Sequence, residues 1–194
     1  KKLNIKVAHV EAGIRSYDMT MPEEINRMVT DSITDYFFTT TRWASSNLVK
    51  AGIDENRIYL VGNVMIDTLL ANIDRFVKPA IYDELNLQEK GYIMLTLHRP
   101  ANVDETNHLK ALMTEIVENA KGLPIIFPIH PRTAKLFAEL GIEAPNLHIV
   151  SPMGYLEFNY MVKRALAVVT DSGGITEETT VMGVPCITLR DNTE

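Results

Sequence analysis

Residues 167–189, with the sequence AVVTDSGGITEETTVMGVPCITL, hold the residue types best suited to binding a phosphate. An apolar run ends at Thr170, a turn of Asp-Ser-Gly-Gly follows, and a helix-like stretch reaches Met182. Unpaired amides and the positive end of the helix dipole converge at such a turn, where an anion can bind. Gly173 and Gly174 lack the Cβ atoms that would hold a phosphate away from the backbone.

Two side chains extend this candidate phosphate site. Ser172 offers a hydroxyl donor, and Glu178, about one turn into the expected helix, can accept hydrogen bonds from a ribose. The same segment also fits an ordinary turn between a strand and a helix, in which the acidic residues only offset the helix dipole. These residues alone leave both interpretations open.

Histidine and arginine recur at the ends of two other apolar runs. The pairs are His98-Arg99 and His130-Pro131-Arg132. Ligands of open α/β sheets bind beyond the carboxyl ends of the strands, and histidine and arginine can donate hydrogen bonds to an anion there. We therefore expect these cationic donors to lie near the Ser-Gly-Gly turn.

Two carboxylates are candidates for acid–base chemistry. Glu11 follows a buried run directly and precedes Gly13, which places it well to face a cleft; it also fits a solvated loop carboxylate. Glu23 lies in the segment Met21-Pro22-Glu23-Glu24, which by itself predicts only a favourable helix start.

The elements that must position these residues alternate between strand-like and helix-like patterns. Strands are expected at 6–10, 36–39, 57–61, 92–97, 125–129, 148–150, 167–170 and 186–189. Three stripes at helical spacing are assigned to the core: Ile25, Met28, Val29 and Ile33; Ile66, Leu69, Leu70, Ile73 and Val77; and Leu109, Leu112, Met113, Ile116, Val117 and Ala120. This alternation predicts an α/β fold with parallel sheets and helices on both faces.

The stretch 78–91 interrupts this rhythm, because it holds a proline, mixed charges and no clean period. We interpret it as a connection between two α/β units, with a boundary between residues 1–80 and 81–194. The first strand pattern is already in progress at the start of the chain. We therefore expect the chain to be a fragment of a longer protein.

Composition excludes several classes of function. The 194 residues carry 25 acidic and 19 basic side chains, a formal net charge of −6, which argues against a general nucleic-acid surface. One cysteine, Cys186, fits a reducing compartment, so we expect a cytoplasmic protein, and no apolar run is long enough to span a membrane. There is no P-loop lysine motif, no G-x-G-x-x-G turn, no G-x-S-x-G elbow and no metal-ligand spacing.

Taken together, the motifs resemble those of the non-hydrolysing UDP-N-acetylglucosamine 2-epimerases. Six segments match in family order: HVEAGIRS at 9–16, PEEINR at 22–27, VGNVMID at 61–67, LHR at 97–99, HPR at 130–132 and TDSGGITEE at 170–178. The resemblance implies two Rossmann-like parallel-sheet domains facing a cleft, as in glycosyltransferases of the B type. Residues 1–80 would be the second half of the N-terminal domain, and 81–194 the UDP-binding domain, incomplete at its end.

The resemblance also implies roles for individual residues. Ser172, Gly173 and Gly174 would hold the diphosphate, and Glu178 the ribose. Arg99, His130 and Arg132 would line the nucleotide site, and the backbone near Tyr155 and Phe158 would meet the uracil. Glu11, Glu23 and His98 match the catalytic positions of the family.

The implied reaction is the reversible inversion of C2 of UDP-N-acetylglucosamine, which gives UDP-N-acetylmannosamine. UDP leaves as the C2 proton is removed, and it then adds back to the resulting glycal. Positioned carboxylates shielded from water can move such a proton, and amides with His98 can stabilise the charge on the leaving oxygen. The resemblance implies no cofactor and no metal, and it implies a homodimer for the whole protein.

One departure from the family matters for activity. A further catalytic aspartate, in a Gly-Asp-Thr segment upstream of the first motif, is absent from this sequence. We therefore expect the 194-residue chain alone to be inactive. A sugar-nucleotide-dependent glycosyltransferase, a hydrolysing epimerase that releases UDP, and a UDP-binding module without turnover remain alternatives.

Overall fold

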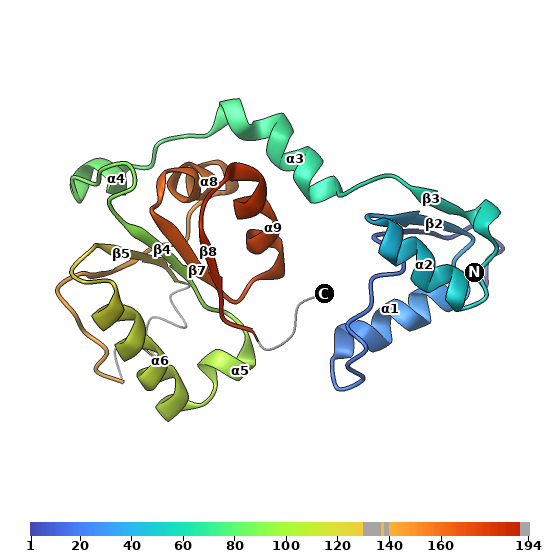
Figure 1. The fold of residues 1–194 in the computed structure, drawn as a ribbon, viewed down its shortest axis with the longest axis horizontal. Helices are drawn as coiled ribbons and strands as arrows, with labels where there is room; N and C mark the ends of the chain where they lie inside the picture. Colours follow the sequence, from blue (N-terminus) through green and yellow to red (C-terminus); the bar gives the residue numbers. More distant parts are fainter. Residues whose placement is uncertain (130–136, 138–139, 191–194) are drawn as a thin grey trace. The chain divides into compact units, whose positions relative to one another are not determined.

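The computed structural model describes residues 1–129, 137 and 140–190. The chain divides into two compact units, Lys1–Thr68 and Leu69–Arg190, and Figure 1 labels most of their helices and strands. Each strand predicted from an apolar run is present, with ends that differ by at most two residues. The predicted α/β class with parallel sheets is confirmed.

Unit 1 holds a parallel sheet in the order β1-β2-β3. Its strands are β1 (Ala8–Val10), β2 (Tyr36–Thr39) and β3 (Ile58–Leu60). Helix α1 (Pro22–Ile33) connects the first two strands, and α2 (Arg42–Lys50) with the short η1 (Glu55–Arg57) connects the next two. This strand–helix–strand repeat is what the sequence pattern predicts for a parallel sheet.

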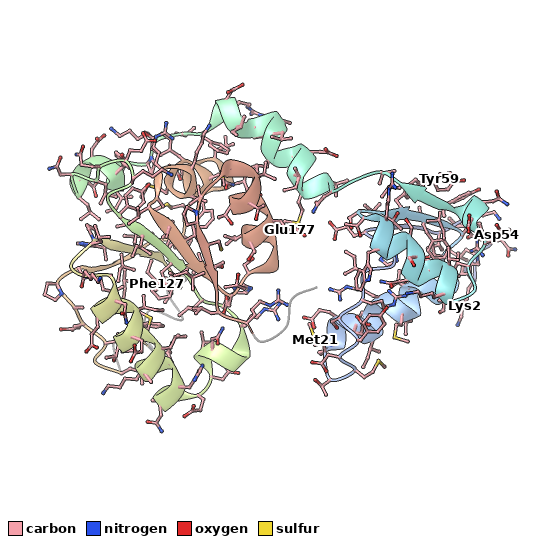
Figure 2. The ribbon with its side chains drawn as sticks, viewed as in Figure 1. Lys2, Met21, Asp54, Tyr59, Phe127 and Glu177 are labelled. Atoms are coloured by element: carbon pink, nitrogen blue, oxygen red, sulfur yellow. The ribbon has the colours of Figure 1, made fainter. Side chains whose placement is uncertain are left out.

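The starts of the two helices follow from local sequence. Pro22 occupies the first turn of α1, where a missing N–H costs nothing, and two acidic residues complement the helix dipole there. Met21 precedes this turn and is labelled in Figure 2. Thr41 caps α2, because its hydroxyl accepts the amide of Ala44 at 3.1 Å.

The apolar stripe of α1 is a helix face, but its assignment to the core was wrong. Ile25, Met28, Val29 and Ile33 are between 44% and 58% exposed. Periodicity identifies residues that share a face, whereas burial requires another element over that face. The described residues of unit 1 leave this face exposed.

Unit 2 holds a five-stranded parallel sheet in the order β6-β5-β4-β7-β8. The strands are β4 (Ile93–Thr96), β5 (Ile125–Pro128), β6 (Leu147–Val150), β7 (Ala167–Thr170) and β8 (Cys186–Thr188). The first strand of unit 2, β4, is the central strand of this sheet. The strands β5 and β6 are added on one side of β4, and β7 and β8 are then added on the other side. The direction of strand addition therefore reverses between β4 and β7, as in other doubly wound sheets.

Helices cover both faces of this sheet: α6 (Thr106–Asn119) packs on one face, and α4 (Ala80–Glu84), α8 (Tyr155–Arg164) and α9 (Gly173–Met182) pack on the other (Figure 1). The remaining helices are α3 (Val64–Asn72), which begins in unit 1, η2 (Ile73–Arg75) and α5 (Pro100–Val103). No helix among the described residues is long and apolar enough to cross a membrane.

Successive residues of the strands alternate between two hydrophobic clusters. Leu95 and Phe127 pack in a cluster with Leu109 and Met113 of α6, which confirms the third predicted stripe as core. Phe127, labelled in Figure 2, is fully buried. Met94 and its neighbours pack in the second cluster with residues of α4 and α8. This alternation explains why the strands read as continuous apolar runs.

Two other expectations differ from the structure. In the second stripe Leu69 is buried, but Leu70 is 52% and Val77 is 49% exposed, because α3 ends before Val77 and only one side of it packs. The stretch 78–91 contains α4, and Ile81 and Leu85 pack against the second cluster of unit 2. Neither short helices nor their packing can be read from a segment without a clean period.

Candidate functional site

The reversal point of the unit 2 sheet places the ends of β4 and β7 side by side. Thr96 and Thr170, the last residues of the two strands, are register partners, and their hydroxyl oxygens lie 2.6 Å apart. Crevices at such reversal points, beyond the carboxyl ends of the strands, are the usual ligand sites of doubly wound sheets. His98 and Ser172 each follow one of these strands by two residues.

The turn after β7 leads directly into α9. Ser172 is its N-cap, and the Ser172 hydroxyl accepts the amide of Ile175 at a long 3.5 Å. The first amides of an α-helix have no partner within the helix. Among residues 1–129, 137 and 140–190, no acceptor is found for the amides of Gly173 and Gly174. Those two amides and the positive end of the helix dipole therefore lie beyond the carboxyl end of β7, where an anion can bind.

The absence of a side chain at Gly173 leaves room for a close approach. A Cβ atom there would lie 2.8 Å from Nη1 of Arg190, which follows β8 at the same edge of the sheet. A guanidinium therefore lies beside the helix N-terminus. Sequence analysis missed Arg190, although its place two residues after an apolar strand is the signal that identified His98.

His98 and Arg99 are held at the turn by Asp171. The backbone amides of His98 and Arg99 donate to Asp171 Oδ2 at 3.0 and 2.9 Å, and Arg99 Nε donates to the Asp171 carbonyl at 3.0 Å. Because Ser172 follows Asp171, these bonds place both predicted residues next to the Ser-Gly-Gly turn. Asp171 itself is fully buried. Sequence analysis did not select it, although a buried carboxylate at a strand end is an unusual feature.

Glu178 lies one turn into α9 and is paired with Tyr155, the first residue of α8. The Tyr155 hydroxyl donates to Glu178 Oε1 at 2.9 Å. Burial raises the pKa of the Glu178 carboxyl above its ordinary value, the hydrogen bond from Tyr155 opposes this, and nearby Glu177 adds to it. Burial, together with the bond to Glu178, raises the pKa of Tyr155 to about 12. The predicted ribose and uracil residues therefore lie side by side.

Of the three remaining predicted residues of unit 2, the structure describes only Phe158. Phe158, on α8, packs partly buried against the second hydrophobic cluster, so its side chain serves the core. Its backbone amide is engaged with the Gly154 carbonyl at 2.8 Å. His130 and Arg132 lie outside the described residues.

Glu11, at the end of β1 in unit 1, has an unusual backbone. Its φ angle is +65°, in the left-handed region that non-glycine residues seldom adopt. The loop is fixed around it, since buried Ala12 donates to the Phe38 carbonyl at 3.0 Å. Gly13 has a φ of +77°, and a Cβ there would lie 2.3 Å from the Ala44 carbonyl oxygen. Only glycine therefore fits where this loop crosses α2.

The two glutamates that start α1 have different environments. Glu23 is exposed, whereas Glu24 is 1% exposed and accepts the Ser16 amide at 2.9 Å and the Tyr17 amide at 3.3 Å. Arg27 lies 3.5 Å from the same Glu24 carboxylate. Glu24 therefore fixes the loop after β1 to α1, and Glu23 is the carboxylate of the pair that is open to solvent.

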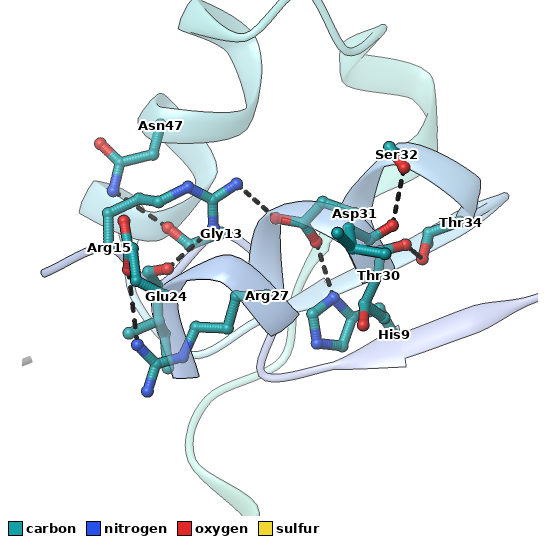
Figure 3. A network of polar contacts seen from close by, with 12 residues as sticks. His9, Gly13, Arg15, Glu24, Arg27, Thr30, Asp31, Ser32, Thr34 and Asn47 are labelled. Carbon is teal, nitrogen blue, oxygen red and sulfur yellow. Dashed lines mark hydrogen bonds and ion pairs between the residues drawn. The ribbon is translucent and has the colours of Figure 1, made fainter. Parts of the chain in front are cut away.

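A buried carboxylate of α1 also ties this loop down. Asp31 is 5% exposed; its two oxygens lie 2.6 Å from His9 Nδ1 and 2.5 Å from Arg15 Nη2 (Figure 3). Burial would raise the pKa of Asp31, but hydrogen bonds and charges of His9 and Arg15 outweigh it, so the pKa lies below its ordinary 3.8. His9 and Arg15 flank Glu11 in sequence, so this network holds both sides of the Glu11 loop.

The structure therefore groups the predicted residues in two sets. His98, Arg99, Ser172, Gly173 and Gly174 lie around the reversal point of unit 2, with Tyr155 and Glu178 between α8 and α9. Glu11 and Glu23 belong to unit 1. The roles given to all of them stay predictions. A doubly wound sheet with open helix amides at its reversal point is typical of α/β proteins that bind phosphorylated ligands.

Comparison with known proteins makes the assignment specific. Residues 1–194 match the family described as UDP-N-acetylglucosamine 2-epimerase, and the chain belongs to this family. It is 45% identical over 204 residues to the UDP-N-acetylglucosamine 2-epimerase of Methanocaldococcus jannaschii, covering 100% of this chain and 56% of that protein. It is 39% identical over 197 residues to UDP-2,3-diacetamido-2,3-dideoxy-D-glucuronate 2-epimerase of Pseudomonas aeruginosa, covering 100% and 54%.

A solved structure agrees with this assignment. The crystal structure of Methanocaldococcus jannaschii UDP-GlcNAc 2-epimerase in complex with UDP-GlcNAc and UDP superposes with a TM-score of 0.85 at 46% identity, over 99% of this chain and 55% of that one. The chain thus spans about half the length of the relatives it matches.

Proposed function

We propose that the protein to which this chain belongs is a UDP-N-acetylglucosamine 2-epimerase that interconverts UDP-N-acetylglucosamine and UDP-N-acetylmannosamine. The observation that carries the proposal is the match of all 194 residues to this family, with 45% identity to a relative of that name. The open amides of Gly173 and Gly174 beside His98 support a diphosphate ligand. The 39% identical uronate epimerase makes its UDP-sugar the second candidate substrate.

The proposed reaction divides the residues by role. Glu11 and Glu23 move the C2 proton; as it leaves, its electron pair forms the C1–C2 double bond and the C1–O bond breaks. The electrons of that bond go to the β-phosphate oxygen of UDP. The amides of Gly173 and Gly174, with Ser172, Arg99, His98, His130 and Arg132, stabilise the charge that develops there. Addition of UDP and return of a proton to the other face complete the inversion.

The nucleoside is held on the other side of α9 in this proposal. Glu178 accepts hydrogen bonds from the ribose hydroxyls, and the start of α8 at Tyr155 and Phe158 meets the uracil. The pairing of Tyr155 with buried Glu178 supports this role, because it fixes the carboxylate before ligand arrives. The proposal also includes a homodimer in the cytoplasm, supported by the family resemblance and by the single cysteine.

The experiment that tests the function uses the full-length gene product with UDP-N-acetylglucosamine in D₂O, followed by ¹H NMR. The account predicts UDP-N-acetylmannosamine, with deuterium at C2 of both epimers and no accumulation of free UDP. Free N-acetylmannosamine with stoichiometric UDP would instead identify a hydrolysing epimerase. Turnover only with an added sugar acceptor would identify a transferase, and UDP binding without turnover a binding module.

Replacing Gly173 by alanine is expected to weaken UDP binding about 10- to 100-fold, the loss of one charge-assisted hydrogen bond. The new methyl group would occupy the phosphate position. The fold should tolerate it, because the nearest atom, 2.8 Å away, is the mobile end of the Arg190 side chain. Calorimetric titration with UDP measures the effect.

Gly183→Ala, at the other end of α9, is the matched control. Its φ of +67° makes alanine strained, while no atom lies within 4 Å of the new Cβ. This variant should lose some stability and keep its affinity for UDP. Equal UDP affinity of the two variants would remove Gly173 from the ligand site.

The raised pKa of Glu178 predicts a pH dependence of ligand binding. The charged carboxylate accepts ribose hydroxyls, so affinity for UDP-N-acetylglucosamine should fall as pH drops toward and through a pKa above the ordinary 4.5. Both phosphates of this ligand are diesters and do not titrate in that range. In Glu178→Gln the affinity should be lower and should lose this dependence; exposed Glu118→Gln should behave as the parent. An unchanged profile in Glu178→Gln would refute the assignment.

A further inference from the structure

Asp171 is the most heavily engaged carboxylate near the reversal point of unit 2. It is fully buried directly after β7. Besides the two backbone amides of the turn after β4, Asn102 Nδ2 donates to its Oδ2 at 3.0 Å. Its Oδ1 lies 2.7 Å from Nδ1 of the His98 ring. Oδ2 accepts both amides of the turn and Asn102, whereas Oδ1 contacts the ring and shares only the His98 amide, at a longer 3.2 Å.

The contact with Asp171 determines which nitrogen of His98 carries the proton. An ionised carboxylate only accepts hydrogen bonds, so Nδ1 must be the donor. Nε2 is then the ring atom left for a ligand. The His98 side chain is 61% exposed, so Nδ1 contacts the buried Asp171 carboxylate while the ring as a whole remains accessible. A carboxylate that binds one ring nitrogen and leaves the other for a ligand is typical of histidines in functional sites.

We propose that Asp171 is a positioning residue for His98: by accepting the Nδ1–H it fixes the ring orientation, so that in the imidazolium form the second proton, on Nε2, is donated in a hydrogen bond to the phosphate oxygen of the leaving UDP. This inference rests on the proposed function. Anchoring the turn after β4 requires only the oxygen that binds the amides and Asn102. Anchoring this turn does not explain the contact of Oδ1 with the His98 ring at 2.7 Å.

Asp171→Asn separates the two roles, because the amide keeps one acceptor and replaces the other with a donor. If the amide oxygen stays with the backbone amides and Asn102, the NH₂ group faces His98 Nδ1. Two donors cannot pair, so the ring proton must move to Nε2. The ring can then no longer hold protons on both nitrogens while it faces this amide, so the charged Nε2–H donor to the phosphate oxygen is lost. Turnover should fall about 10- to 100-fold, the range found for hydrogen-bond partners of metal-ligating histidines. Affinity for UDP should change much less.

A double-mutant cycle tests whether Asp171 acts through His98. In the full-length gene product, kcat is measured for Asp171→Asn, His98→Gln and the double variant. A positioning role predicts that Asp171→Asn costs little once His98 is gone; equal costs in both backgrounds would overturn it. Asn102→Ala is the control, since it removes a partner of the same carboxylate and leaves the ring contact. It should retain most of the turnover.

A second readout is independent of turnover. Long-range ¹H–¹⁵N NMR of histidine-labelled protein, at a pH where the ring is neutral, should give the Nδ1–H tautomer for His98 in the parent and Nε2–H in Asp171→Asn. The Nε2–H tautomer in the parent would overturn the inference. Absence of epimerisation by the parent, with the predicted tautomers present, would count against the proposed function and leave the pairing intact.

Discussion

Glu11→Gln is expected to lower kcat for epimerisation about 10²- to 10⁴-fold, the usual contribution of a general acid or base. Glutamine has the same size but cannot take a proton. The loop should keep its shape, because it is held by the Ala12 amide on Phe38 and by the Gly13 contact with α2 rather than by the Glu11 carboxylate. Initial rates and exchange of the C2 proton with D₂O measure the loss.

The control for Glu11→Gln is the same substitution at Glu55, an exposed residue of η1 in the same unit. It should leave kcat unchanged. UDP affinity should be retained in Glu11→Gln, since the residues proposed to bind the diphosphate and the ribose belong to unit 2. A kcat for Glu11→Gln within tenfold of the parent value would contradict a role for this carboxylate in proton transfer.

Asp31→Asn is expected to destabilise β1 and α1 by about 3–5 kcal/mol, the cost of removing one partner from a buried ion pair. Both neighbours are largely buried: the side chains of His9 and Arg15 are 16% and 10% exposed. The amide NH₂ group of asparagine would face either His9 or Arg15, and the Arg15 guanidinium would lose the carboxylate charge that pairs with it. Hydrogen-exchange mass spectrometry of peptides from β1 and α1 should show the loss as faster exchange.

The pH dependence of the same region follows from the lowered pKa of Asp31. The folded pKa is below the ordinary 3.8, so the stabilisation is complete above that pH and is lost as pH falls below it. Asp31→Asn should remove this acid dependence. Asp54 is an exposed N-cap at which asparagine caps equally well, so Asp54→Asn should change neither the exchange rates of β1 and α1 nor their acid dependence. Unchanged exchange in Asp31→Asn would contradict a stabilising network.

Local sequence was sufficient to predict where the strands lie and that they run parallel. Apolar runs such as Ala167–Thr170 are continuous because both faces of a parallel sheet are covered, and the Ser-Gly-Gly segment carries its own helix start. These features depend on neighbouring residues only. The turn at Ser172 and the helix α9 therefore appear where the sequence predicts them.

Features that depend on distant residues could not be predicted in the same way. Asp31 meets His9 across 22 positions, and Asp171 meets His98 across 73. Neither contact follows from spacing, because the sheet order decides which strand ends become neighbours. The exposed stripe of α1 shows the opposite case, in which a correct helical period does not determine burial.

The central claim is that the amides opening α9 bind a pyrophosphate next to His98. A crystal structure of the full-length gene product with UDP tests it most directly. The account predicts diphosphate oxygens within hydrogen-bonding distance of the Gly173 and Gly174 amides, with Nε2 of His98 directed at the β-phosphate. A nucleotide bound elsewhere, or those two amides occupied by an acceptor from the protein itself, would contradict the account.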